Sequence, residues 1–189
     1  MISGDQTKQI LYKTIEEIGK EIIQADISSN IDSSKRYIDT ILSQCLRRLT
    51  SELDDDVSDI ITVTLCEALL HFMLTISTLP SERKVAVRDG LTLDIVIPSL
   101  AVLKGDPGRS VIIQFIKDKR PDLNKVKELE ILQPNTENIW LVSSRPLSIP
   151  KCIDYSIFPG HGSHRYSNII VNTDKFLRDV KDKSFRFIP

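Results

Sequence analysis

Two strand-like segments decide how this 189-residue chain folds: LTLDIVIPS at residues 91–99 and VIIQFIKDKR at residues 111–120. Both are rich in the β-branched residues that favour strands. The segment KGDPGRS at 104–110 lies between them and has the Gly and Pro residues typical of a turn. We therefore predict two neighbouring strands joined by a hairpin turn. The first carries Asp94, and the second carries Gln114 and Lys117.

The first of these strands is predicted to alternate its side chains between two faces. Alternation puts Asp94 on one face with Thr92 and Val96, and it puts Leu91, Leu93, Ile95 and Ile97 on the other. A carboxylate in the middle of a strand is costly to bury without a partner. From the residues alone, Asp94 is expected to pair with a nearby Lys or Arg or to lie at an open sheet edge.

Helical patterns dominate the first eighty residues. Isoleucines at helical spacing predict a helix over about 6–25, and a second helix is predicted to start near Asp32 or Ser33. A third, over about 57–78, is apolar on most of its circumference, which indicates burial on several sides. Because these helices carry much apolar surface, we expect them to pack on the rest of the chain or to form a homodimer.

The rest of the chain alternates strand and helix patterns. Further strands are predicted in KVAVRDG (84–90), NIWLVSS (138–144), IDYSIF (153–158) and YSNIIVN (166–172). Helices are predicted in DLNKVKELEIL, capped by Asp122, and in TDKFLRDVKDK, capped by Thr173 or Asp174. The predicted fold class is α+β, with a helical region at 1–56 and, at 57–189, a mixed sheet covered by helices and followed by a short C-terminal helix.

Composition limits the classes of partner. The net charge is −1, so any attraction to nucleic acid has to come from a local patch. The N-terminus lacks a signal-peptide pattern, and no uninterrupted apolar run reaches the roughly 20 residues of a membrane span, so no membrane partner is expected. Three distant cysteines without a CxxC pair predict a reduced, cytoplasmic protein.

The element order helix, three-strand meander, helix, strand over about 57–145, together with Asp94, resembles the core of the restriction-endonuclease-like, or PD-(D/E)XK, nuclease superfamily. In that superfamily an Asp on the second strand and an acid on the third bind a divalent metal. A lysine two residues after the third-strand acid helps to activate water, and an acid from the preceding helix often joins. The resemblance implies Mg²⁺ as cofactor and Asp94 as its ligand. It also implies catalytic positions at Gln114, Lys117 and Glu67.

The third strand departs from that pattern. If Gln114 stands at the acid position, Ile116 stands where the lysine belongs, and Lys117 is one residue out of phase. Gln114 and Lys117 then point to opposite faces unless a bulge intervenes. Replacing a carboxylate by an amide about 4 Å from a cation removes roughly 4 kcal/mol at an effective dielectric near 20, or about a thousandfold in affinity.

Glu67 lies in a narrow polar stripe of the third helix, with Thr64, His71 and Thr75. The stripe has two interpretations. It faces the opening of the sheet and brings Glu67 to Asp94, or it is a solvated strip with a Glu67–His71 pair one helical turn apart.

Two further segments are candidate nucleic-acid contacts. DKRPDLNKVK at 118–127 either meets phosphates or is a solvated loop and helix face, and its candidate residues are Lys119, Arg120, Lys125 and Lys127. FPGHGSHRYS at 158–167 either binds an anion or a metal or is a surface loop, and its candidates are His161, His164 and Arg165.

Two functional hypotheses follow. The first is a nuclease-like protein that binds or processes nucleic acid, such as an Mg²⁺-dependent endonuclease or phosphodiesterase, with a weakened or absent metal site. The second is a non-catalytic scaffold that keeps the fold and binds a protein partner, or a second copy through its N-terminal helices. Asp94 beside Gln114 and Lys117 favours the first, and the near-neutral charge and broken third-strand motif favour the second.

Overall fold

A computed structural model describes residues 4–49, 55–87, 90–118, 121–147 and 149–185. Six strands form one sheet in sequence order, the first three antiparallel and the others parallel, so the sheet is mixed as predicted. The strands are β1 Glu82–Ala86, β2 Thr92–Ile97, β3 Val111–Phe115, β4 Ile139–Ser143, β5 Ile153–Ser156 and β6 His164–Arg165.

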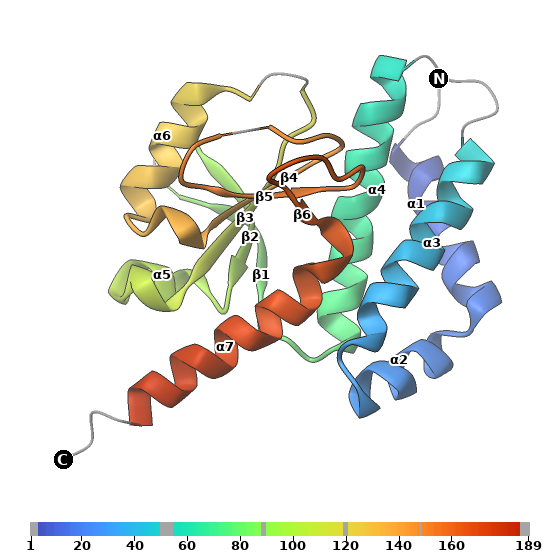
Figure 1. The fold of residues 1–189 in the computed structure, drawn as a ribbon, viewed down its shortest axis with the longest axis horizontal. Coiled ribbons are helices and arrows are strands. Elements are labelled where there is room, and N and C mark those ends of the chain that lie inside the picture. Colours follow the sequence, from blue (N-terminus) through green and yellow to red (C-terminus); the bar gives the residue numbers. More distant parts are fainter. Residues whose placement is uncertain (1–3, 50–54, 88–89, 119–120, 148, 186–189) are drawn as a thin grey trace.

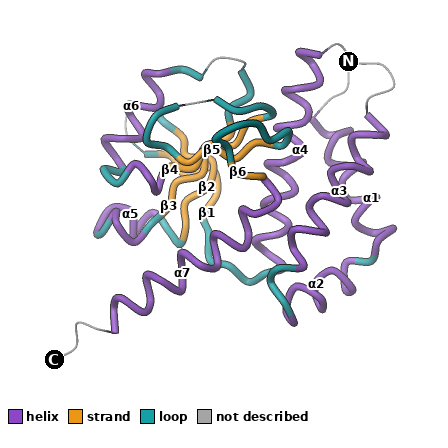
Figure 2. Tube along the Cα trace, in the orientation of Figure 1, coloured by secondary structure: helices purple, strands orange, loops and turns teal. Residues whose placement is uncertain are grey.

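Helices cover both faces of the sheet (Figure 1; Figure 2). Helix α4 lies on one face, α5 and α6 lie on the other, and α1, α2 and α3 form a further layer outside α4. The helices are α1 Gly4–Ile18, α2 Lys20–Ser29, α3 Ser33–Leu49, α4 Asp55–Ile76, α5 Leu100–Gly105, α6 Leu123–Leu132 and α7 Ile169–Phe185. Short 3₁₀ turns occupy Pro107–Arg109, Thr136–Asn138 and Tyr166–Asn168.

Helix α4 joins the helical layer to the sheet. One apolar cluster runs from Leu11 of α1 through Leu65 and Leu69 of α4 to Ile113 and Val142 of the sheet. This packing explains why α4 is apolar almost all round. Its segment Asp59–Ile76 is long and apolar enough to cross a membrane by length and composition, and 72% of that segment is buried inside the protein.

The predicted helix over 6–25 is two helices, so the single-helix prediction was wrong. The chain turns at Gly19, whose φ of 99° lies in the left-handed region that favours glycine. A Cβ at Gly19 would lie 3.1 Å from the Ile22 side chain, so this position has little space for another residue. The apolar stripe continues on both sides of the turn, and for that reason the pattern looked like one helix.

The connection between β2 and β3 is also different from the prediction. KGDPGRS is not a hairpin turn, because α5 and a 3₁₀ turn fill this connection. Ser99 begins α5 by accepting a hydrogen bond from the Val102 N–H at 3.3 Å. Leu103 is buried in the cluster on the α5–α6 face, and burying this side chain favours a short helix over a tight turn.

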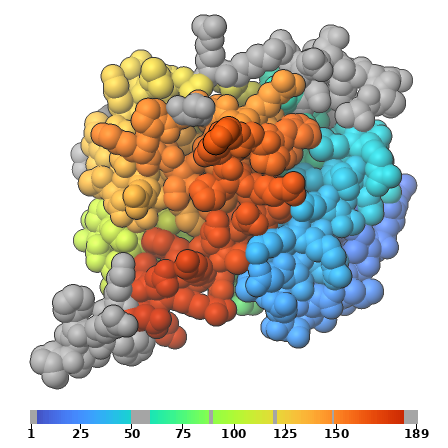
Figure 3. Space-filling view, viewed as in Figure 1, coloured from blue at the N-terminus to red at the C-terminus, as the bar shows by residue number. Residues whose placement is uncertain are grey.

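The segment YSNIIVN was wrongly predicted as a strand. Its first residues form a 3₁₀ turn, and Ile169 and Ile170 begin α7, where both are fully buried. Thr173, predicted as a cap, lies inside that helix and its hydroxyl donates to the Ile169 carbonyl at 2.8 Å. The Tyr166 hydroxyl donates to the Cys66 carbonyl of α4 at 2.6 Å, which fixes this segment beside the helical layer. In Figure 3 the segment, coloured orange to red, meets α3 along the visible face.

Candidate functional site

The three antiparallel strands lose their regular pairing at one point. Strand β1 pairs Arg83 with Ile95 and Val85 with Leu93, and Lys84 between them has a left-handed φ of 49°. On the other side, the β2–β3 pairing ends at Ile95 with Ile113. The sheet therefore opens beside Asp94, the residue that follows Leu93.

The predicted alternation of β2 breaks at the same point. Ile95 and Ile97 face α4 as expected, but Leu93 packs with Val96 in the cluster under α5 and α6. Leu93 and Ile95 are therefore on different faces, and the predicted common face was wrong. The irregular backbone around Asp94 changes the side-chain direction in the way that a bulge does.

Side chains replace the main-chain ladder where β2 and β3 separate. The Asp94 N–H donates to Gln114 Oε1 at 3.3 Å, and the Phe115 N–H donates to Asp94 Oδ2 at 2.8 Å. Gln114 Nε2 also donates to Asp94 Oδ2, at 2.5 Å. Asp94 and Gln114 are 8% and 1% exposed, so this exchange satisfies polar groups that have little access to water.

Lys84 binds two carboxylates from different elements. Its ammonium lies 2.7 Å from Asp94 Oδ1 and 2.5 Å from Glu67 Oε1 of α4. The amino-acid pattern did not single out Lys84, which is one polar residue in an alternating strand. Its contact follows from the left-handed backbone at Lys84 and from the position of α4, and the sequence shows neither directly.

Lys117 completes the arrangement from the end of β3. Its ammonium lies 3.0 Å from Glu67 Oε2. Strand β3 ends at Phe115, so the pleat no longer fixes the direction of Lys117, and the phase argument against it does not apply. Glu67 thus points toward the sheet, in the direction that the first interpretation of its stripe gave, but it binds two lysines, which that interpretation did not include. We call Glu67, Lys84, Asp94 and Lys117 the four-charge cluster.

The lysines shift the protonation of the cluster. Burial acts to raise the pKa of the Glu67 carboxyl, but the bonds from Lys84 and Lys117 outweigh it, and the pKa lies below its ordinary value of 4.5. Burial acts to lower the pKa of the Lys84 ammonium, but Asp94 and Glu67 outweigh it, and the pKa is raised. Both groups are therefore charged at neutral pH.

The lowered pKa of Glu67 predicts a pH dependence of stability. A carboxyl whose folded pKa is depressed stabilises the protein above its unfolded pKa, and this contribution is lost as the pH falls through the folded value. We expect the free energy of unfolding to decrease as the pH falls below about 4.5, and to decrease less steeply in Glu67→Gln. Urea unfolding across that range measures it, with Glu128→Gln at an exposed site of α6 as control. Equal slopes in wild type and Glu67→Gln would contradict the assignment.

A pocket of about 380 Å³ opens beside the cluster. Lys117 lies on its wall, and the pocket lies at the carboxyl ends of β3 and β4. Ligands of α/β sheets commonly bind outside the carboxyl ends of parallel strands. The other lining residues are Asp59, Ile116, Asp118, Ser143, Ser144, Arg145, Pro146 and Leu147.

Comparison with solved structures identifies the fold. The chain matches a restriction endonuclease PspGI–substrate DNA complex with a TM-score of 0.57 and 12% identity, covering 92% of this chain and 93% of that one. This protein has a restriction-endonuclease-like fold. A metal-depleted Ecl18kI bound to uncleaved, modified DNA matches at a TM-score of 0.56 and 11% identity, covering 95% and 86%. A second metal-depleted Ecl18kI complex with uncleaved DNA matches at 0.54, also with 11% identity, covering 95% and 80%.

The likeness was found by comparing structures and not by comparing amino-acid sequences. No protein-family model matches the chain, and no curated protein matches it in sequence. The restriction-endonuclease-like fold agrees with the predicted fold class and with the resemblance drawn from element order and Asp94.

The donor set of the four-charge cluster and Gln114 does not fit a Mg²⁺ ion in the observed arrangement. Among the described residues, no three His, Cys, Asp or Glu side chains come together as a metal site. Lys84 binds oxygens of both carboxylates, and Gln114 directs an N–H donor, not an oxygen, at Asp94. A hard cation needs oxygen ligands on several sides, and here nitrogen donors fill those directions. The predicted role of Asp94 as a metal ligand stays a prediction.

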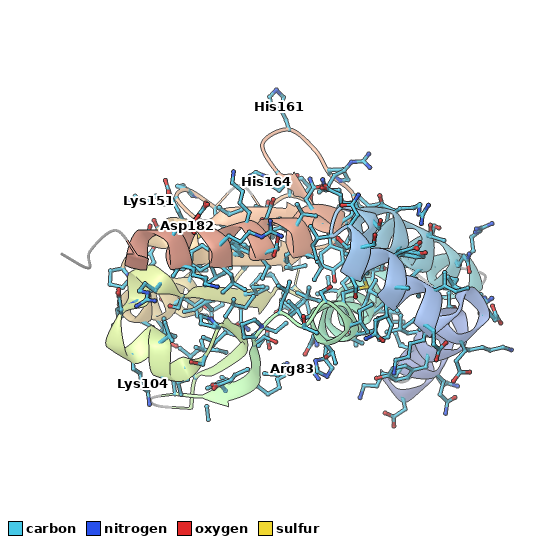
Figure 4. All side chains as sticks on the ribbon, turned by 90° about the horizontal axis from the view of Figure 1, so that it is seen from below. Arg83, Lys104, Lys151, His161, His164 and Asp182 are labelled. Carbon is cyan, nitrogen blue, oxygen red and sulfur yellow. The ribbon has the colours of Figure 1, made fainter. Side chains whose placement is uncertain are left out.

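The predicted nucleic-acid contacts lie apart from the cluster. Lys125 and Lys127 are on α6, which covers the opposite face of the sheet, and Lys119 and Arg120 are outside the described residues. His164 and Arg165 form β6, at the far edge of the sheet from β1, and the His164 ring lies 5.5 Å from that of Tyr155. Figure 4 shows His161 at the tip of a loop on the opposite side of the molecule from Arg83. Their contacts with nucleic acid stay predictions.

Proposed function

We propose that the protein is a nuclease-like DNA-binding protein whose buried carboxylates are neutralised by lysines instead of Mg²⁺. The observation that carries the proposal is the exposure of the four-charge cluster. The side chains of Lys84 and Lys117 are 51% and 39% exposed, whereas those of Glu67 and Asp94 are 11% and 10% exposed. A molecule that approaches the cluster therefore meets ammonium groups first.

Exposed ammonium groups over buried carboxylates suit a phosphate better than a free cation. Lysine contacts to phosphates supply most of the sequence-independent affinity of DNA-binding proteins. Arg145 is exposed on the same pocket wall as Lys117 and extends the basic surface, although Asp59 and Asp118 also line that pocket. All three structural neighbours described above come from DNA complexes of restriction enzymes, which supports DNA as the partner.

The proposal predicts DNA binding without metal. Fluorescence anisotropy with a labelled DNA duplex in EDTA should detect binding at low salt, and binding should weaken as salt rises. Lys117→Met should reduce the affinity about three- to tenfold and lower the salt slope by about 1. Lys104→Met, at an exposed position of α5 away from the cluster, is the matched control and should bind like wild type (Figure 4).

Four outcomes would count against the proposal. Absence of duplex binding at low salt would remove DNA as the partner, and stronger binding to RNA of the same length would replace it. Cleavage of DNA in Mg²⁺ or Mn²⁺ that disappears in Asp94→Ala would show that the carboxylates do hold a metal. Equal affinity in Lys117→Met and wild type would move the DNA contact elsewhere.

The scaffold hypothesis has one observation of its own. Tyr12 of α1 and Ile22 of α2 are 51% and 58% exposed, although most apolar side chains of these helices are buried against α3 and α4. A second copy or a protein partner could cover them. Sedimentation analysis of the purified chain distinguishes a second copy from a different protein partner. The homodimer hypothesis requires a dimer in the absence of DNA.

A further inference from the structure

We infer that the Lys84 ammonium occupies the cation position of this fold and thereby excludes divalent metal. The inference deepens the proposed function and rests on it, because it identifies the group that stands where a metal would bind. The ammonium is within 2.7 Å of one oxygen from each of two carboxylates that belong to different elements. A bridging metal would need those same two oxygens.

The charges of the cluster already balance. Glu67 and Asp94 carry two negative charges, and Lys84 and Lys117 together supply the two positive charges that one divalent ion would bring. A further divalent ion next to Lys84 would add positive charge that no remaining carboxylate of the cluster balances, in a partly buried site where water screens poorly. Metal entry therefore requires Lys84 to leave both carboxylates.

The surrounding structure holds Lys84 in place. Its left-handed backbone is a conformation that a non-glycine residue seldom adopts and that persists when neighbouring contacts stabilise it. Lys84 bonds both carboxylates, and its neighbours in β1 pair regularly with β2 on either side. The backbone conformation thus fixes where the Lys84 side chain begins, and two ion pairs hold its ammonium.

Gln114 fits the same inference. The Asp94 oxygen that Lys84 does not bind accepts from Gln114 Nε2 and the Phe115 N–H. A carboxylate at position 114 would bring a third negative charge that two lysines do not balance. An amide instead supplies a donor to Asp94 and an acceptor for the Asp94 N–H, without adding charge.

The test is Mn²⁺ binding to the purified protein without DNA, read from the electron paramagnetic resonance signal of free Mn²⁺. Lys84→Met keeps the length of the side chain and removes its charge, and it should bind Mn²⁺ about tenfold or more tightly than wild type. Lys84→Arg keeps the charge and should stay like wild type, as should Lys104→Met. Adding Glu67→Gln to Lys84→Met should abolish the gain, which places the bound ion at the cluster.

Two results would overturn the inference. The first is a folded Lys84→Met protein with no gain in Mn²⁺ affinity. The second needs no Lys84 variant. If wild type binds Mn²⁺ and the Glu67→Gln variant does not, metal already enters the cluster beside Lys84. If the Mn²⁺ affinity of wild type is no higher than that of Glu67→Gln, the inference is supported, even if Lys84→Met does not fold. Because DNA is absent, failure of DNA binding in the anisotropy measurement leaves this result unaffected.

Discussion

Replacing Asp94 with alanine should lower the free energy of unfolding by about 3–5 kcal/mol, because it leaves two buried donors without an acceptor and removes a partner of the half-exposed Lys84. The Asp94 carboxylate accepts from the Phe115 N–H and from Gln114, and it binds Lys84. Its removal leaves a buried main-chain N–H and a buried amide without an acceptor, and a cluster with one excess positive charge. Unsatisfied buried donors each cost about 1–3 kcal/mol, which supports the upper part of that range.

Urea unfolding followed by the fluorescence of Trp140, the single tryptophan, measures this loss. Asp179→Ala, at an exposed position of α7, is the matched control and should change stability by no more than about 0.5 kcal/mol. A loss below about 1 kcal/mol in Asp94→Ala would mean that water replaces the carboxylate and that the hydrogen bonds described here contribute little.

A double-mutant cycle divides that loss between the ion pair and the hydrogen bonds. Lys84 pairs with Asp94 and Glu67, so Lys84→Met should destabilise wild type more than it destabilises Asp94→Ala. The hydrogen bonds from Phe115 and Gln114 do not involve Lys84, so their part of the loss in the free energy of unfolding remains when Asp94→Ala is made in a Lys84→Met background.

The order of elements was predictable because each depends on a local pattern. Long apolar helices and most short β-branched runs can be recognised from their local pattern, and the meander, α6 and β4 followed from them. The run YSNIIVN is the exception, because tertiary packing places its isoleucines at the start of α7. Two of the errors occur where a single residue determines the local secondary structure. Gly19 splits one apolar stripe into two helices, and Leu103 turns a Gly/Pro-rich connection into a short helix.

Asp94 and Glu67 of the four-charge cluster were singled out in the sequence because each is an acid in an otherwise apolar element, but their pairing with lysines was not predicted. Lys117 was identified, but its reach was misjudged because the strand was assumed to continue past Phe115. Lys84 was missed, since its contact depends on a left-handed backbone, a conformation that favours Gly and Asn and that a lysine in a sequence does not indicate.

Changing Gln114 to glutamate tests the charge balance of the whole site. The new carboxylate would lie beside that of Asp94, in a place where Gln114 is 1% exposed, and would replace an N–H donor by a like charge. We expect the free energy of unfolding at neutral pH to fall by about 2–4 kcal/mol. Like charge and burial both raise the folded pKa of the added carboxyl, so the penalty is present above that pKa and disappears below the unfolded pKa.

The decisive measurement is therefore the pH dependence of the difference between Gln114→Glu and Gln114→Met. Gln114→Met loses both amide hydrogen bonds and adds no charge, so its deficit in the free energy of unfolding should stay nearly constant with pH. Gln114→Glu keeps an acceptor for the Asp94 N–H but adds a charge, so its deficit should shrink as the pH falls toward 4. Parallel curves for the two variants would mean that the lysines can balance a third carboxylate. In that case the amide at position 114 is not required by charge, and the exclusion of metal rests on Lys84 alone.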